Sequence, residues 1–477
     1  MKKESKPIPE GGIRNSFKEL GVPKTLLLGL QHMFAMFGAT ILVPILIGNY
    51  FGMEHPPIQV TLFFAGVGTL FFHVCTKMQV PAFLGSSFAF LGGFASVANL
   101  NEGIYANMDS VEKLQYACGG VVVSGLLYLL LALVMKVVGV KRVIRFLPPV
   151  VTGPMIILIG LSLAPSAVNN ASQNWVLAGI ALLVIVVCNI WGKGMVRIIP
   201  ILLGVVIAYL AAVVFQFVFH VTNPDGSAIL DFSGAAACAS EGLLGFINLP
   251  EFKLAKFDLT AVFIMAPIAI ATMMEHIGDI SSISATVGEN YVENPGLQRT
   301  LVGDGIATSL AGMFGGPANT TYGENTGVLE LSKVYDPRVI RLAAVYAIIL
   351  SFSPFVARII GSIPSSIIGG VSFVLYGMIS AVGVRNVVEN QVDFRNSRNL
   401  IIAALILVTG LGFSNGLTFT IGTTSVTLTS LALAALVGII SNAILPGKDY
   451  IFHGDNEAKL KTSSETIPTI SDADLED

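Results

Sequence analysis

The chain has 477 residues, of which 53% are hydrophobic and only 12% are charged, and its formal net charge is −3. Soluble proteins carry about 25% charged residues. The composition therefore excludes an ordinary soluble domain and indicates an integral membrane protein with many helices. The small net charge gives no sign of a nucleic-acid partner. The sequence shows no pattern of a metal site, a nucleophile–base pair or a phosphate-binding loop, so we expect neither an enzyme nor a cofactor.

Apolar segments divide the chain into fourteen predicted membrane spans, each close to the roughly 20 residues that a bilayer requires. They are 25–48, 59–75, 81–98, 115–138, 147–167, 174–191, 197–219, 260–283, 299–314, 319–332, 339–360, 366–384, 398–414 and 426–445. The third and tenth are short and rich in Gly, Ser and Thr, so a search by hydropathy alone would miss them.

The loop charges support this count. If both termini are cytoplasmic, most Lys and Arg residues fall on that side, whereas the long outer loop 220–259 carries Asp225, Asp231, Glu241 and Glu251. This is the positive-inside distribution of membrane proteins. Omitting either short segment would invert the orientation between them and destroy the pattern. We therefore predict that 81–98 and 319–332 are membrane elements and that both termini are cytoplasmic.

The two short segments are seven spans apart, which divides the chain into two repeats of seven. Repeats with an odd number of spans enter the membrane in opposite orientations. We expect 81–90 and 315–331, both interrupted by Gly and Pro, to be broken segments that meet near mid-membrane. A non-helical backbone at that depth must be buried in protein or line a cavity. Transporters usually bind their substrates at such a place.

Ionisable residues inside a membrane usually have a function. Glu275 and Asp279 are four residues apart, so they share one face of the eighth span and could hold and release a proton. Asp304 in the ninth span is either a third proton-coupling residue or a partner of nearby backbone. His276 points about 100° away from Glu275 around the helix, which favours packing. His32 in the first span either contacts the site or braces the eighth span.

The stretch Tyr322-Gly323-Glu324 combines a carboxylate with a backbone that glycine leaves open to close approach. In an imide ring such as a pyrimidine dione, carbonyl acceptors alternate with N–H donors. Such a ring could therefore bind both the carboxylate and the exposed backbone N–H groups of this stretch. The alternative is that Glu324 only caps the start of a half-helix. In the other broken segment, Phe88 could stack on a flat ring, or simply pack.

The element Thr320-Thr-Tyr-Gly-Glu-Asn-Thr-Gly327 resembles the nucleobase–ascorbate transporter family, also called nucleobase:cation symporters, and especially its bacterial uracil permeases. The resemblance extends from about residue 20 to residue 445. It includes Gln31–Thr40, Pro81–Phe90, Glu275–Gly278 and Asn294–Arg299.

This resemblance implies an all-α membrane fold of fourteen segments in two inverted repeats, with broken third and tenth segments. A core domain (25–138, spans 1–4, and 260–360, spans 8–11) would hold the substrate beside a gate domain (147–219, spans 5–7, and 366–445, spans 12–14). The remaining parts are a cytoplasmic tail (1–24), the extracellular loop (220–259) and an acidic cytoplasmic tail (446–477). Family members are homodimers in the cell membrane, and their core moves like an elevator.

The resemblance also implies roles at the site. Glu275 and Glu324 would bind opposite sides of the base, with Tyr322, Gly323 and Phe88 lining the pocket. Asn325 fills a position of the family signature and, like His32, would support the site. Glu275, Asp279 and Asp304 are the proton-coupling candidates.

The resemblance leaves the substrate open. Uracil permeases carry His at the position of Asp279, where purine-type members carry Asp. Purine-type members, however, carry Gln at the position of Glu324. We therefore expect uracil import by proton symport, with xanthine or another purine, and sodium coupling, as alternatives. A second alternative is an anion transporter of the related sulfate-permease architecture, which the acids at 275, 279 and 324 oppose.

Overall fold

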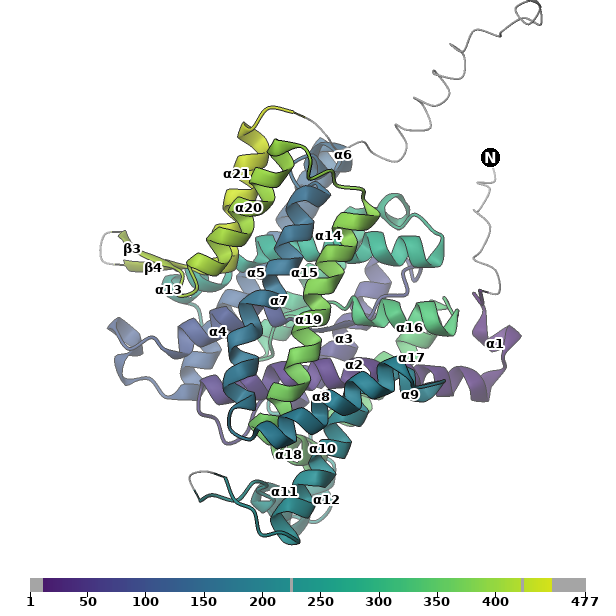
Figure 1. Ribbon diagram of the computed structural model, residues 1–477, viewed down its shortest axis with the longest axis vertical. Coiled ribbons are helices and arrows are strands. Elements are labelled where there is room, and N and C mark those ends of the chain that lie inside the picture. The colour runs from purple at the N-terminus through teal and green to yellow at the C-terminus, as the bar shows by residue number, and fades with distance from the viewer. Residues whose placement is uncertain (1–11, 224–225, 422–423, 448–477) are drawn as a thin grey trace, which may run out of the picture.

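The computed structural model describes residues 12–447, apart from 224–225 and 422–423, and consists mainly of helices (Figure 1). The helices of the first half are α1 (Ser16–Glu19), α2 (Val22–Tyr50), α3 (Ile58–Cys75), α4 (Leu91–Ala98), α5 (Ser110–Val138), α6 (Val140–Ile144), α7 (Pro149–Ala171), α8 (Trp175–Ile190), α9 (Met195–Ile198), α10 (Pro200–Phe217), α11 (Ser233–Ser240) and α12 (Leu243–Phe246). Those of the second half are α13 (Leu259–Met265), α14 (Ile268–Val287), α15 (Leu297–Met313), α16 (Glu324–Ser332), α17 (Pro337–Ser351), α18 (Pro354–Gly361), α19 (Ser365–Glu389), α20 (Ser397–Gly412) and α21 (Ser430–Ile444). The strands are β1 (Leu84–Ser86), β2 (Asn319–Thr321), β3 (Leu417–Ile421) and β4 (Thr424–Leu428).

Long apolar helices make this a multi-pass membrane protein. In the described part of the chain, seven helices are long and apolar enough to cross a membrane, and the bent pair α17–α18 makes an eighth. Four shorter apolar helices accompany them. Every span predicted from the sequence overlaps one or two of the helices given above, or a strand followed by a helix.

The two short polar segments meet, as the sequence predicts. β1 pairs antiparallel with β2 in the register Leu84↔Thr321, Gly85↔Thr320 and Ser86↔Asn319. A single 3-10 turn, η1 (Phe88–Phe90), and then α4 follow β1, while α16 follows β2. The strand pairing satisfies backbone groups that have no helical partner, which makes a broken segment tolerable at membrane depth.

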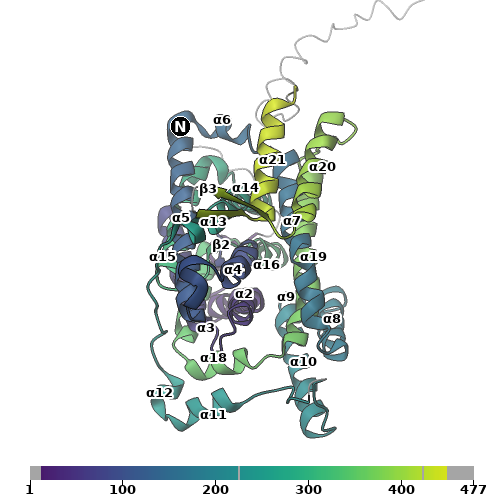
Figure 2. The ribbon, with the colours of Figure 1, turned by 90° about the vertical axis from the view of Figure 1, so that its left-hand side faces the viewer.

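The strand pair lies deep in the molecule. In Figure 2, β2 and the half-helices α4 and α16 lie between a layer containing α3, α5 and α15 and a layer containing α7 and α19. Helix α14 packs against η1, β2 and α16, so it touches both broken segments. This arrangement brings the acids of α14 to the point where the two half-helices begin.

Two predicted spans differ in the structure. The eleventh, predicted as one helix over 339–360, is two helices, α17 and α18, bent by 89°. Ser353-Pro354 explains the break, since proline disfavours helix in the residue before it and begins α18 instead. The fourteenth, predicted over 426–445, begins as strand β4 and becomes helical only at Ser430. β-branched residues such as Thr424 and Val426 favour the strand.

The structure describes the N-terminal segment from residue 12 and the C-terminal segment up to residue 447. Ile13 forms a parallel bridge with Val334, and Ser16 donates two hydrogen bonds to the buried Asp336. The described part of the predicted tail 1–24 therefore packs on the end of α16. The predicted acidic tail, 446–477, lies outside the described residues from position 448 onward.

Candidate functional site

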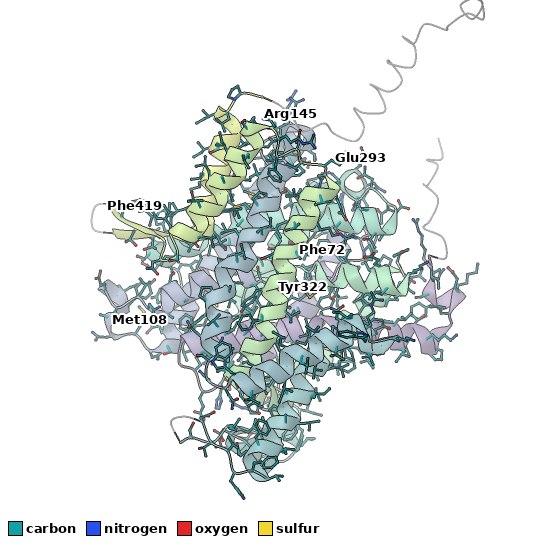
Figure 3. The ribbon with its side chains drawn as sticks, in the orientation of Figure 1. Phe72, Met108, Arg145, Glu293, Tyr322 and Phe419 are labelled. Atoms are coloured by element: carbon teal, nitrogen blue, oxygen red, sulfur yellow. The ribbon has the colours of Figure 1, made fainter. Side chains whose placement is uncertain are left out.

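Tyr322 lies at the centre of the molecule (Figure 3) and connects the two broken segments by a hydrogen bond. Its hydroxyl donates to the carbonyl of Ser86 at 2.8 Å and also lies 3.4 Å from the Thr40 hydroxyl of α2. The ring lies directly over Gly85, where an added Cβ would come within 2.5 Å of two ring atoms. Only glycine at position 85 leaves room for this ring, so the tyrosine position depends on both segments.

Asp279 of α14 faces the start of α16. A Cβ added at Gly323 would lie 2.9 Å from Asp279 Oδ1, and the Asp279 side chain is 3% exposed. Glu275, one turn earlier on the same helix face, is partly exposed. The structure thus brings Asp279 next to the Tyr322–Gly323 segment, with Glu275 one turn earlier on the same face of α14.

The first turn of α16 contains the two remaining predicted residues of this segment. Glu324 begins the helix, and its side chain lies outside the described part of the structure. Asn325 is 1% exposed, and neither its side-chain nitrogen nor its oxygen has a hydrogen-bond partner among the described residues. The helix N-terminus directs backbone N–H groups and a partial positive charge toward the strand pair.

Phe88 lies at the boundary between the two predicted domains. Its buried ring meets the ring of Tyr376 on α19 edge to face, with centroids 5.8 Å apart. Tyr376 is 2% exposed, and its hydroxyl has no hydrogen-bond partner among the described residues. Sequence reasoning missed Tyr376, because a tyrosine in an apolar span resembles ordinary packing.

His32 lies on α2 and is completely buried. Among the described residues neither ring nitrogen has a hydrogen-bond partner, so no hydrogen bond accompanies the predicted bracing of the eighth span. Helix α2 does pack against α16, which places His32 in a helix beside the site.

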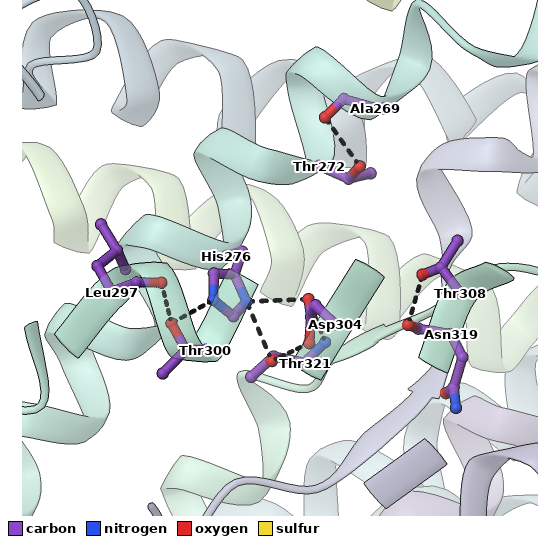
Figure 4. Close-up of polar contacts among 9 residues, drawn as sticks. All are labelled: Ala269, Thr272, His276, Leu297, Thr300, Asp304, Thr308, Asn319 and Thr321. Atoms are coloured by element: carbon purple, nitrogen blue, oxygen red, sulfur yellow. Dashed lines mark hydrogen bonds and ion pairs between the residues drawn. The ribbon is translucent and has the colours of Figure 1, made fainter. Parts of the chain in front are cut away.

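Asp304 and His276 form a buried network behind β2 (Figure 4). His276 Nδ1 lies 2.9 Å from Asp304 Oδ2, and the two side chains are 1% and 0% exposed. Thr321 donates its backbone N–H to Asp304 Oδ2 at 3.3 Å and its hydroxyl to Oδ1 at 2.8 Å. The prediction that His276 only packs is therefore wrong, because α15 places an acid beside it. The signal in the sequence was Asp304, since an acid at membrane depth needs a partner.

A cavity of about 640 Å³ lies elsewhere, at the end of the molecule that carries the loop 220–259. Its lining includes Glu54, Asp109, Lys253 and Arg358, and none of the predicted binding residues. The candidate site is instead the buried group of residues around the strand pair.

Known proteins resemble this chain over most of its length. A sequence model of the Permease family matches residues 23–419. The chain is 39% identical to the uracil permease of Bacillus caldolyticus over 440 residues, which cover 90% of this chain and 93% of that protein. It is 38% identical to the uracil permease of Bacillus subtilis over 436 residues, covering 87% and 91%.

A solved structure, the transmembrane domain of a cyanobacterium bicarbonate transporter, BicA, has a similar fold. The TM-score is 0.56, the sequence identity is 16%, and the match covers 91% of this chain and 99% of that one. At this identity the likeness concerns the fold alone.

Proposed function

Because the chain belongs to the Permease family and is 39% identical to a bacterial uracil permease, we propose that it is a secondary active transporter that imports a nucleobase, with uracil as its main substrate. The observation that carries this proposal is the position of the α14 acids. Asp279 lies against Gly323, so its carboxylate, with Glu275 one turn earlier on the same helix face, adjoins the backbone that leads into α16.

The pairing of β1 with β2 supports an architecture of fourteen segments in two inverted repeats. In this architecture the core domain (25–138 and 260–360) moves like an elevator against the gate domain (147–219 and 366–445). Both termini are cytoplasmic, the protein lies in the plasma membrane, and it forms homodimers. The fold likeness to a membrane domain of a transporter supports the architecture.

The binding mode follows from the chemistry of uracil, a planar ring with two N–H donors and two carbonyl acceptors. Glu275 binds one edge of the ring and Glu324 the opposite edge. Tyr322 and Gly323 form the wall between them, because Tyr322 is fixed by the strand pair. Phe88 covers one face of the ring together with Tyr376, the ring it already meets. Asn325 and His32 support the site from the adjoining helices.

Proton symport couples uptake to the membrane gradient. Glu275 is protonated in the loaded state, and Asp279 tunes that proton, because two neighbouring carboxylates disfavour double ionisation. Asp304 supports these two acids from behind β2 through its hydrogen bonds to Thr321 and does not itself exchange the transported proton. Since carboxylates can also bind sodium, replacement of the proton by sodium is the alternative that the experiment below decides.

Two other substrates compete with uracil. Asp279 favours xanthine or another purine within the same mechanism. An anion such as bicarbonate is suggested only by the fold likeness. Clustered acids would repel an anion at the site, whereas a neutral base suits them.

The test is a competition panel in liposomes that contain only the purified protein. Uptake of labelled uracil is measured with excess unlabelled uracil, xanthine, hypoxanthine, sulfate or bicarbonate, at two pH values, with and without sodium. We expect competition by uracil alone, and faster uptake with an inward proton gradient irrespective of sodium. Stronger competition by xanthine would assign the purine alternative, and competition by bicarbonate would reject a nucleobase transporter.

A further inference from the structure

The buried pair His276–Asp304 joins the two halves of the candidate site. His276 directly follows Glu275 on α14, and Asp304 on α15 accepts two hydrogen bonds from Thr321, which directly precedes Tyr322. The Thr321 hydroxyl also lies 3.2 Å from His276 Nδ1. A shift in this pair would therefore change the position of Glu275 relative to Tyr322. Both side chains are almost completely buried, so an unpaired charge on either would be costly.

The surrounding hydrogen bonds indicate how many protons the pair holds. Thr300 donates its hydroxyl proton to the carbonyl of Leu297 at 2.9 Å, and the same hydroxyl oxygen lies 2.9 Å from His276 Nε2 (Figure 4). With the Thr300 hydroxyl donating to the Leu297 carbonyl, Nε2 is the donor to Thr300.

The other ring nitrogen faces Asp304. Both oxygens of that carboxyl group accept hydrogen bonds from Thr321, which favours a carboxylate. Nδ1 therefore supplies the proton in the 2.9 Å contact with Oδ2. The result is an imidazolium paired with a carboxylate, neutral as a whole, that holds one proton between its members.

The remaining surroundings of the imidazole are aromatic. Tyr128 of α5 and Phe72 of α3 meet it edge to face, with ring centroids 6.4 Å and 6.5 Å away. These rings cover the imidazole from two further helices. Of the groups that contact the His276 ring, the Asp304 carboxylate is thus the one whose negative charge balances the imidazolium.

We propose that His276 is a positioning residue of the transport site: as an imidazolium it binds Asp304 and holds β2 against α14, which sets the distance between Glu275 and Tyr322. The identity of the substrate rests on the proposed function. Asp304 acts through His276 and Thr321 and does not touch the base.

A double-mutant cycle tests the pair. His276→Asn and Asp304→Asn each leave one member of a buried pair without its partner, and we expect each to raise the KM for labelled uracil on the order of 100-fold. In the variant with both changes, the amide introduced at position 276 can donate to the amide introduced at position 304, and no buried charge remains. We expect that variant to recover to within about tenfold of the original KM and to keep the original pH profile of uptake.

Matched controls exclude a general effect of losing a buried histidine. His73 is also fully buried, and its Nε2 lies 3.0 Å from the Ala82 carbonyl, away from Asp304. His73→Asn should not be rescued by Asp304→Asn. A double variant of 276 and 304 that is as impaired as the single variants would overturn the proposal, and so would a flattened pH profile in that variant, because the pair would then carry the transported proton.

Two measurements need no substrate. Unfolding temperatures in detergent are measured for the original chain, His276→Asn, Asp304→Asn and the variant with both changes. They should fall in both single variants and recover in the double variant. Absence of any such coupling would overturn the proposed interaction of His276 with Asp304. Nitrogen NMR of histidine-labelled protein should show a doubly protonated imidazole that disappears in His276→Asn, and a neutral ring would contradict the assignment. If the original chain transported no nucleobase, the proposed function would be wrong. These two measurements would still show whether His276 and Asp304 interact as proposed.

Discussion

Gly323 lies where a side chain would collide with the carboxylate of Asp279. An added Cβ would approach Asp279 Oδ1 to 2.9 Å, a distance that forces one of the two groups to move. At the scale of single residues, the candidate site therefore depends on a close contact between α14 and the backbone that leads into α16. Small changes at this contact should alter substrate binding more than they alter folding.

Gly323→Ala should weaken substrate binding about tenfold or more, because inserting a methyl group into a packed site costs about 1–3 kcal/mol. Gly327→Ala is the matched control in the same half-helix, since nothing lies within 4 Å of a Cβ added there. Calorimetric titration of both purified variants with uracil measures the difference. Equal affinities of the two variants would contradict the close contact.

Spacing alone could predict part of this site. Glu275 and Asp279 share a helix face because they are four residues apart. The intramembrane position of Asp304 indicated that it needs a partner, although it did not identify His276. Tyr376 and Gly85 could not be predicted, because their contacts with Phe88 and Tyr322 join segments that are distant in sequence.

Among the contacts between secondary-structure elements, Asp336 holds the N-terminal segment against the end of α16. Its carboxylate, 2% exposed, accepts the backbone N–H of Ser16 at 2.9 Å and the Ser16 hydroxyl at 2.8 Å, and it also caps α17 through Arg338 N. Arg14 forms an ion pair with Glu289, just beyond α14. Arg14 and Ser16 thus join the ends of α14 and α16, the two helices that border the site.

Asp336→Asn should lower the unfolding temperature by a few degrees. The amide nitrogen would face donors at Ser16, and a buried group left without a partner costs about 1–3 kcal/mol. Asp393→Asn removes the same charge at an exposed position, where the carboxylate accepts the backbone N–H of Arg395. Thermal unfolding in detergent compares the two variants, and an equal effect on both would show that the N-terminal contact does not stabilise the fold.

The elements that the sequence predicts best are those with a simple physical constraint. The positive-inside charge pattern required two short extra membrane segments, and β1 and β2 are found paired where these segments lie. The break between α17 and α18 and the hairpin of β3 and β4 were not predicted. Hydropathy does not distinguish a straight helix from a bent one, and the proline signal was outweighed by the apolar run.

In the molecule as a whole, the ring contact between Phe88 and Tyr376 connects the proposed core domain to the proposed gate domain. Elevator movement of the core against the gate must break this contact. A covalent link across it should therefore stop transport while leaving the protein folded.

Phe88→Cys/Tyr376→Cys protein from which the four native cysteines have been removed should retain part of its uptake, and we expect a bifunctional thiol reagent to arrest that remaining uptake relative to the same protein without the reagent. The control pair, Ile157→Cys/Ser380→Cys, joins α7 and α19 inside the proposed gate, where Ser380 already bonds to the Ile157 carbonyl. Its linkage should leave uptake nearly unchanged. Full transport in the linked Phe88–Tyr376 protein would rule out relative movement of these two domains at this contact.

The most direct measurement of the central claim is accumulation of labelled uracil in liposomes with an imposed inward proton gradient, comparing the original chain with Glu275→Gln. We expect the original chain to accumulate uracil above its external concentration. We expect no such accumulation by Glu275→Gln, because glutamine cannot accept and release the coupled proton. Uphill accumulation by Glu275→Gln would contradict the assignment of Glu275 as the proton-carrying residue.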